Sequence, residues 1–344
     1  MKALLLSDYN RLEIVDVPLP RPGPGEVLIR VEACGICGSD VHGYDGSSGR
    51  RIPPVIMGHE AAGVIAALGP GVAGIREGDP VAPDSTIYCG ECEYCRRGEM
   101  NLCNRREVLG VSTADFRRAG AFAEFVTVPG RIVHRLPETL PFAEAAMIEP
   151  LAVAVHAVDL AHPPENGAAL VVGAGMIGLL TLQALRIAGC SEICVVDIDD
   201  SRLELAKQLG ATTTINSKTS DVPTMQFDVA MEAVGSTPAI QAAIGSVRKG
   251  GTVVLIGNIA PAVEIPLQIV VSRQLRLQGS AASAGEYPRC IDLLARGEVN
   301  VKPLISIIAP LEEGPQWFER LHARQANLMK VILTPAASSE KRSQ

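Results

Sequence analysis

Residues 169–180 read ALVVGAGMIGLL, and this stretch decides the fold of the second half of the chain. An apolar run ends at Val172 and is followed at once by the spacing G-x-G-x-x-G. In this pattern the first glycine permits a tight turn, the second lets the backbone approach a pyrophosphate, and the third lets a helix pack closely on a strand. The stretch therefore predicts a strand, a turn and a helix around a dinucleotide site, which is formed by Gly173, Gly175, Met176, Ile177 and Gly178.

The next apolar run, EICVVDID, carries Asp197 at its end, about twenty residues after the glycines. A carboxylate at this place can hold the adenosine ribose hydroxyls and would repel the extra phosphate of NADP. We therefore expect NAD as the cofactor. Arg202 follows a few residues later, where it could serve a 2′-phosphate or lie on a helix surface, and the sequence leaves both roles open.

The pattern of strands and helices divides the chain into two parts. From Leu151 to residue 286 apolar runs such as FDVAMEAVG and GGTVVLIG alternate with helical segments, which is typical of a parallel, doubly wound Rossmann sheet. Up to residue 150 short β segments such as GEVLIRVEACGIC and AEFVTVP are separated by Gly and Pro, which indicates an irregular, mostly antiparallel barrel. The predicted fold class is thus α/β, with a mostly-β domain before a Rossmann domain.

A cysteine cluster lies in the first part, in the run CGECEYCRRGEMNLC. Its spacing, C-x2-C-x2-C-x7-C, lets one loop place four thiolates around a single ion, and zinc favours four sulfurs at a closed structural site. Disulfides are less favoured, because the start MKALLLSDYN does not continue as a secretory signal. A nucleic-acid-binding zinc ribbon would leave the glycine motif unexplained. The predicted structural zinc ligands are Cys89, Cys92, Cys95 and Cys103.

Three further segments, GICGSDVHGY, MGHEAAG and MIEPLAVAVHA, carry zinc-type ligands outside the Rossmann part. Together they offer one thiolate, one imidazole and two carboxylates, whereas a catalytic zinc needs about three protein ligands and one open position. The candidate ligands of this second zinc are Cys37, His59, Glu60 and Glu149.

These motifs together resemble the zinc-dependent medium-chain dehydrogenases, the alcohol dehydrogenase superfamily, over nearly the whole chain. Glu149, where the alcohol dehydrogenases have cysteine, resembles the sorbitol, galactitol and butanediol dehydrogenase branch, and VNVKPLI at 299–305 resembles sorbitol dehydrogenases. The resemblance implies a GroES-like catalytic domain of residues 1–150 and 287–344 and a Rossmann NAD-binding domain of residues 151–286. It also implies an active-site cleft between them and two zinc ions per chain, one catalytic and one structural.

The resemblance further implies roles for residues around the catalytic zinc. Cys37 and His59 bind the ion, and either Glu60 or Glu149 binds directly while the other waits behind a water. Asp40 orients His59. Ser39 accepts the alcohol proton and passes it through the cofactor ribose to His42, while hydride moves to NAD+ and leaves a ketone.

The expected substrate is a secondary alcohol of a polyol, a diol or a sugar-derived compound. Many polyol dehydrogenases carry Phe-Arg-Tyr where this chain has 281–283, Ala-Ala-Ser, so the polar groups that face substrate hydroxyls are missing. This favours a vicinal diol of the butanediol type, a shorter polyol or a sugar acid of the idonate or galactonate type. A zinc-free reductase would leave the ligand set without a purpose, and a non-catalytic zinc- and NAD-binding relative stays open as the alternative.

Other polar residues have two interpretations each. Tyr44 and Glu107 could line the substrate pocket or serve packing, and Arg117 and Arg118 could hold a carboxylate or phosphate or lie in a solvated turn. Lys330 matches a basic residue that faces the cofactor phosphates in the family. Buried small hydrophobes are the expected role of the remaining cysteines, which are Cys34, Cys190, Cys194 and Cys290.

The 344 residues carry a net charge of −7, which argues against nucleic acid or an anionic membrane as a partner. The apolar stretch 167–190 contains the glycine motif, Gln183 and Arg186, so we interpret it as strand, turn and helix, not as a membrane span. We expect a cytoplasmic protein. The resemblance implies a homotetramer or homodimer, in which the apolar segment 267–279 takes part in the interface.

Overall fold

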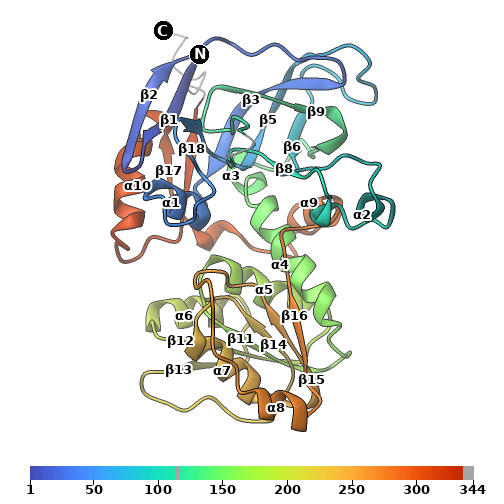
Figure 1. Ribbon diagram of the computed structural model, residues 1–344, viewed down its shortest axis with the longest axis vertical. Helices are drawn as coiled ribbons and strands as arrows, with labels where there is room; N and C mark the ends of the chain where they lie inside the picture. The colour runs from blue at the N-terminus through green and yellow to red at the C-terminus, as the bar shows by residue number, and fades with distance from the viewer. Residues whose placement is uncertain (113–116, 336–344) are drawn as a thin grey trace. The chain divides into compact units, whose positions relative to one another are not determined.

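The computed structural model describes residues 1–112 and 117–335, and the chain divides into two compact units. The first unit consists of Met1–Glu149, Tyr287–Ala295 and the segment from Leu304 onward; the second consists of Pro150–Glu286 and Arg296–Pro303. The expected fold class is confirmed, because the first unit is mostly antiparallel β structure and the second has a parallel sheet with helices packed on it (Figure 1).

The segment Arg296–Pro303 departs from the expectation, which placed all of 287–344 in the first domain. Asn300 explains the difference. Its N–H donates to Gln183 Oε1 at 2.7 Å, and Gln183 Nε2 donates back to the Asn300 carbonyl at 3.2 Å. Since Gln183 is a buried residue of helix α5 (Met176–Ile187), this exchange ties the segment to the second unit.

The main sheet of the first unit has the strand order β10-β6-β5-β3-β18-β17, and β9 also pairs with β3. Strand β3 lies inside this sheet, paired with β5, β9 and β18, and its apolar side chains, such as Val27 and Ile29, are fully buried. The β3–β5 pairing sets Gly35 opposite Glu60, which positions the start of β5 for the site described below. The bounds are β1 (Lys2–Asp8), β2 (Arg11–Asp16), β3 (Glu26–Gly35), α1 (Gly38–Tyr44), β4 (Val55–Ile56), β5 (Glu60–Leu68), β6 (Pro80–Pro83), β7 (Thr86–Ile87), α2 (Glu93–Arg96), β8 (Glu107–Val108), β9 (Phe125–Pro129), β10 (Val133–Arg135), α3 (Phe142–Ala145), α9 (Tyr287–Ala295), β17 (Ile305–Pro310), α10 (Gly314–His322) and β18 (Lys330–Thr334).

The sheet of the second unit is parallel and has the order β13-β12-β11-β14-β15-β16. The strand order reverses direction at β11, so the carboxyl ends of β11, β12 and β14 flank the switch point at which such sheets bind ligands. Helices α5, α6 and α7 pack against these strands (Figure 1). The bounds are β11 (Ala168–Val172), β12 (Glu192–Asp197), α6 (Asp200–Gln208), β13 (Thr213–Asn216), β14 (Phe227–Glu232), α7 (Thr237–Ser246), β15 (Val247–Leu255), α8 (Leu267–Ser272) and β16 (Arg276–Gly279), and helix α4 (Ile148–Ala161) begins in the first unit and continues in the second.

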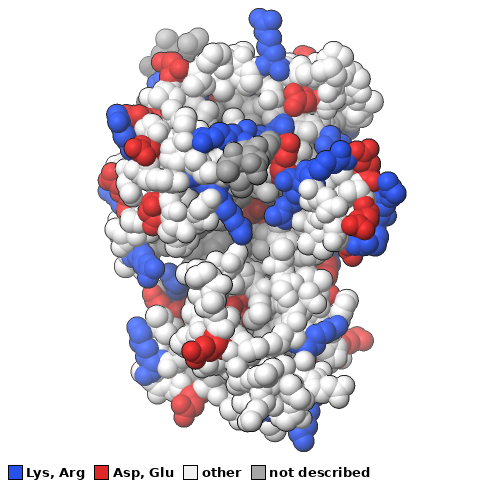
Figure 2. Space-filling model, in the orientation of Figure 1, with Lys and Arg blue, Asp and Glu red and all other residues white. Residues whose placement is uncertain are grey.

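The stretch 167–190 forms β11, the glycine turn and α5, as expected. Among the residues that the structure describes, none of the helices combines the length and the apolar character needed to cross a membrane. Basic and acidic side chains are interspersed on the face shown in Figure 2.

Candidate active site and metal centres

The glycine turn between β11 and α5 has the geometry that the sequence predicts. Gly173 has a φ of +100°, a conformation that side chains other than glycine rarely adopt. A Cβ atom on Gly178 would lie 1.7 Å from the Gly173 carbonyl oxygen, whereas a Cβ on Gly175 would meet nothing within 4 Å. The turn is therefore closed at Gly178 and open at Gly175, and the open side offers room for a pyrophosphate at the start of α5.

Asp197 ends β12 and its carboxylate holds the glycine turn. Its Oδ2 accepts a hydrogen bond from the Ala174 N–H at 2.6 Å, and its Oδ1 accepts from the N–H groups of Ile198 and Asp199 at 2.7 and 3.0 Å. The role predicted for Asp197 at the ribose stays a prediction, but the carboxylate also fixes the backbone beside it. Arg202 is an exposed residue of α6, near the helix start that Asp199 caps.

Glu232, at the end of β14, is a neighbour of this turn that the sequence analysis missed. Its Oε1 accepts from the N–H groups of Val234 and Gly235 at 2.9 and 2.7 Å, and burial raises the pKa of the carboxyl. A Cβ on Gly173 would lie 2.7 Å from Val234 Cγ2, so the segment that Glu232 holds packs against the glycine turn. An acidic residue at the end of the mostly apolar run FDVAME was the available signal.

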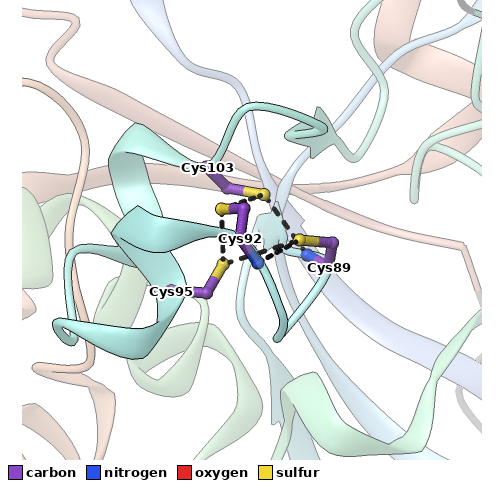
Figure 3. Close-up of side chains that lie close together, drawn as sticks. All are labelled: Cys89, Cys92, Cys95 and Cys103. Carbon is purple, nitrogen blue, oxygen red and sulfur yellow. Dashed lines mark hydrogen bonds between the residues drawn. The ribbon is translucent and has the colours of Figure 1, made fainter.

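The four cysteines of the predicted structural site converge (Figure 3). Their Sγ atoms lie 3.9 Å apart for Cys89 and Cys95, 3.5 Å for Cys92 and Cys95, and 3.9 Å for Cys92 and Cys103. Thiolates at about 2.3 Å from one zinc ion would be separated by about 3.8 Å in a tetrahedron. A hydrogen bond from the Glu91 N–H is the main reason that the pKa of Cys89 is lowered to about 5, which favours the thiolate form that binds metal. The donor set therefore fits a structural zinc ion.

Three of the four candidate ligands of the second zinc ion also lie close together, and the fourth, Glu149, lies outside the group. Cys37, which precedes α1, and His59 and Glu60, at the start of β5, place ligand atoms within 4.8 Å of one another. His59 and Glu60 are 5% and 1% exposed and Cys37 is partly exposed, and one thiolate, one imidazole and one carboxylate meet in the group. This donor set fits a zinc ion with three protein ligands.

Glu149, the other candidate carboxylate, is not a member of this close group. It lies at the start of α4, and its Oε1 accepts a hydrogen bond from Ser85 Oγ at 3.1 Å. Desolvation raises its pKa, and the charges of His59 and Glu60 are near enough to act on it. Glu149 is thus a neighbour of the cluster, and its part in metal binding stays a prediction.

Asp40 connects His59 to a buried arginine. Its Oδ1 lies 3.4 Å from His59 Nδ1 and accepts a hydrogen bond from Arg51 Nη2 at 2.8 Å. The His59 contact has an ion-pair distance but not the geometry of a hydrogen bond, and His59 Nδ1 is buried with no hydrogen-bond partner among the described residues. This arrangement turns Nδ1 toward the carboxylate and leaves Nε2 for an ion, as the predicted orienting role of Asp40 requires.

Lys330 has a buried partner that the sequence analysis did not identify. Its Nζ is 2.8 and 2.6 Å from the two carboxylate oxygens of Glu60 and also donates to the Ile36 carbonyl at 3.0 Å. Lys330 is 3% exposed and belongs to β18 in the first unit. The ammonium group thus forms a buried pair with a candidate metal ligand, and its predicted role at the cofactor phosphates stays a prediction.

The two residues of the expected proton relay lie on α1. Ser39 Oγ accepts a hydrogen bond from Arg51 Nη2 at 3.0 Å. His42 Nδ1 lies 3.3 Å from Ser47 Oγ and the ring is partly exposed. Ser39 thus lies two residues after the candidate ligand Cys37, both Ser39 and His42 are partly exposed, and their relay function stays a prediction.

Comparison with known proteins identifies the family of this chain. The model of the alcohol dehydrogenase GroES-like domain matches residues 23–138, and that of the zinc-binding dehydrogenase matches residues 177–296. Sorbitol dehydrogenase from Bacillus subtilis (strain 168) is 35% identical, over 97% of this chain and 97% of that protein. The chain belongs to the zinc-binding alcohol dehydrogenase family.

Solved structures of this family share the whole fold. A putative zinc-binding dehydrogenase from Sinorhizobium meliloti 1021, bound to NADP, has a TM-score of 0.90 and 33% identity, covering 97% of this chain and 99% of that chain. A protein of Escherichia coli CFT073, described as a short chain alcohol dehydrogenase and complexed with NADH, has a TM-score of 0.88 and 31% identity, covering 97% and 99%. Family members thus bind either nicotinamide cofactor.

The remaining candidate residues of this dehydrogenase have structural partners. The Tyr44 hydroxyl donates to the Asn10 carbonyl at 3.0 Å, and its ring packs on Phe318. Arg117 Nη1 donates to the carbonyls of Ile52 and Pro54, while Arg118 pairs with Glu26 and Glu107. Tyr44 thus has a packing role, Arg117 is exposed and bonded to backbone carbonyls, and the predicted roles of these residues at a substrate stay predictions. The cysteines outside the two clusters are buried, as expected; they are Cys34, Cys190, Cys194 and Cys290.

Proposed function

We propose that this protein is a zinc-dependent dehydrogenase that oxidises a secondary alcohol of a polyol, a diol or a sugar-derived compound to a ketone and transfers the hydride to NAD+. The observation that carries the proposal is the convergence of Cys37 with the buried His59 and Glu60, in a chain that also carries the open glycine turn. The likeness to a sorbitol dehydrogenase supports a polyhydroxylated substrate.

Two zinc ions per chain would fill the two donor sets. The four-cysteine set is closed by its own thiolates and is structural, whereas the set of Cys37, His59 and Glu60 leaves a position for substrate. A zinc ion bound there supplies a Lewis acid for the substrate hydroxyl. Lys330 competes for Glu60, which keeps Glu149 as an alternative carboxylate ligand.

The protein's own residues then handle the proton. The Ser39 hydroxyl, two residues after Cys37, receives the alcohol proton, and His42 passes it to water. Both side chains lie on the short helix α1, which begins directly after Cys37. The candidate ligand, the hydroxyl and the imidazole thus follow one another within six residues, and the partly exposed His42 ring supports a relay that ends at water.

NAD is the proposed cofactor. Asp197 presents a carboxylate at the end of β12, where a 2′-phosphate would be repelled, and its hydrogen bonds to the backbone hold that charge in place. Arg202 is exposed on α6 and is the residue that would favour NADP if it turned toward the ribose. Because relatives bind either cofactor, the ratio of NAD to NADP turnover tests this part directly.

A vicinal diol, a short polyol or a sugar acid is the proposed substrate class. The residues at 281–283 are small, and Ser283 is buried, so this segment presents little polar side chain to a long polyol.

A homotetramer or homodimer is the proposed oligomeric state, supported by the exposed apolar side chains of Leu267 and Val271 on α8. The proposed location is the cytoplasm. The proposed catalytic domain consists of residues 1–150, 287–295 and 304–344, and the proposed Rossmann domain consists of residues 151–286 and 296–303.

The test is the initial rate of NADH formation with diols, C3 to C6 polyols, aldonic acids and simple secondary alcohols, read by absorbance. We expect a clear rate on one stereochemical set, with NAD preferred over NADP. Absence of turnover across the panel, in protein shown to carry both zinc ions, would favour the non-catalytic relative and contradict the proposal.

A further inference from the structure

Arg51 is a buried cation at the candidate active site that the sequence analysis did not single out. Its side chain is 3% exposed, and its Nη2 donates both to Ser39 Oγ at 3.0 Å and to Asp40 Oδ1 at 2.8 Å. Asp40 is fully buried and neutralises the guanidinium charge. One nitrogen therefore joins the candidate relay hydroxyl to the carboxylate that faces His59.

The chain around Arg51 is held on both sides. Ser112 N–H donates to the Arg50 carbonyl at 2.9 Å, and Ser112 Oγ accepts from the Ile52 N–H at 2.8 Å. The arginine stem crosses α1 at Gly43, where a Cβ atom would lie 2.7 Å from Arg51 Cγ and Cδ. The guanidinium is thus fixed against the helix that carries Ser39.

The hydrogen bonds of Arg51 are not those of a pair built for stability alone. The strongest arginine–carboxylate pairs are bidentate, with two parallel N–H···O bonds. Here one nitrogen is shared between Ser39 and Asp40, and the buried Nε has no hydrogen-bond partner within the described ranges. The guanidinium thus makes a single hydrogen bond to Asp40 and another to the Ser39 hydroxyl.

We propose that Arg51 is a positioning residue for proton transfer, which orients the Ser39 hydroxyl as the acceptor of the substrate proton. Because Arg51 occupies one lone pair of Oγ, the other lone pair and the O–H are left for the relay. The alcohol O–H bond breaks and a new bond to Ser39 Oγ forms, while the original serine proton passes onward toward His42. Arg51 keeps all its protons, and its charge favours the electron density that gathers on Oγ. This inference rests on the proposed function, because the proton transfer belongs to the proposed oxidation of an alcohol.

The first arm of the test compares Arg51→Met with Arg50→Met, since Arg50 is the exposed neighbour. We expect Arg51→Met to lower kcat about ten- to a hundredfold, within the range for proton-transfer catalysis. The affinity for NADH and the zinc content should stay unchanged, and the solvent deuterium isotope effect on kcat should rise, because the transferred hydroxyl proton exchanges with solvent. Arg51→Lys should recover part of the rate, and Arg50→Met should behave as wild type.

The second arm asks whether Arg51 acts through Ser39. In a double-mutant cycle, Arg51→Met should cost little further rate once Ser39→Ala is present. Additive losses would overturn the proposal, as would a loss of one zinc ion or a large loss of stability in Arg51→Met, because Arg51 would then serve only to hold Asp40 and His59.

A crystal structure of Arg51→Met gives a readout that needs no turnover. A changed Ser39 rotamer supports the positioning role, and an unchanged rotamer overturns it. If the wild-type protein oxidises no alcohol, the proposed function fails, and the serine rotamer still decides whether Arg51 orients Ser39. If the wild type is active and Arg51→Met is equally active, only the role of Arg51 fails.

Discussion

The two glycines of the turn between β11 and α5 give a matched pair of substitutions with opposite expected effects. In Gly178→Ala the new Cβ would lie 1.7 Å from the Gly173 carbonyl oxygen, and real Cβ contacts essentially never fall below 3.0 Å. The neighbouring atom is backbone and cannot rotate away, so the turn and the helix must separate by about 1.3 Å, the difference between those two distances. In Gly175→Ala the new Cβ meets nothing within 4 Å, and the residue has an ordinary φ of −76°.

The costs follow from these distances. Overpacking of a tight contact costs about 1–3 kcal/mol, and a displaced turn would also weaken the hydrogen bond from the Ala174 N–H to Asp197, at about 1 kcal/mol. We therefore expect Gly178→Ala to lower the unfolding temperature of the second unit by roughly 4–15 °C. Gly175→Ala should leave that temperature unchanged but weaken NADH binding at least about tenfold, or about 1.4 kcal/mol, because the methyl group fills the space kept for the pyrophosphate.

The assay is thermal unfolding followed by calorimetry, paired with titration of NADH by isothermal calorimetry. The two variants must separate: one loses stability and the other loses affinity. Wild-type stability in Gly178→Ala would refute the packing argument. Wild-type affinity for NADH in Gly175→Ala would refute the placement of the pyrophosphate at the open side of the turn.

Three further predictions concern the buried charges and the structural site. Lys330→Met should cost about 3–5 kcal/mol in urea unfolding, because Glu60 is left as an unpaired buried charge, and adding Glu60→Gln should restore part of it; equal stability of wild type and single variant would contradict the buried pair. Cys95→Ser should remove one zinc ion per chain and lower the unfolding temperature, which metal analysis and calorimetry measure, and an unchanged zinc content would rule out the four-cysteine site. Asp197→Ala should weaken NADH binding at least about tenfold. The control variant Asp199→Ala removes only the cap of α6, so it should cost about 1 kcal/mol of stability and little NADH affinity. Similar NADH affinities in both variants would count against a special role of Asp197.

The local features of this fold could be predicted because each depends on a short stretch of sequence. The glycine turn follows from spacing and from the apolar run before it, and the four-cysteine cluster lies within one loop. The group of Cys37, His59 and Glu60 could be predicted only through the resemblance to the zinc-dependent dehydrogenases, since each of the three segments is ambiguous by itself and the sequence does not choose between Glu60 and Glu149.

The contacts that sequence reasoning missed are side-chain pairings that no local pattern marks. Lys330 is 270 positions from Glu60, and an ammonium group in the apolar strand β18 shows that a buried partner exists but not which one. Arg51 lies in a segment without periodicity, so neither its burial nor its bond to Ser39 has a local signal. Asn300 joined the second unit through a side-chain amide on α5, which no composition boundary marks.

The measurement that tests the central claim most directly is the rate of NADH formation by wild type and by Cys37→Ser, on the best alcohol of the panel and with zinc content determined on the same samples. The account predicts two zinc ions and turnover for the wild type, and one zinc ion and no turnover for Cys37→Ser, with the four-cysteine site still filled. Full turnover by Cys37→Ser, or a wild-type protein that holds both ions and oxidises no alcohol, would contradict it.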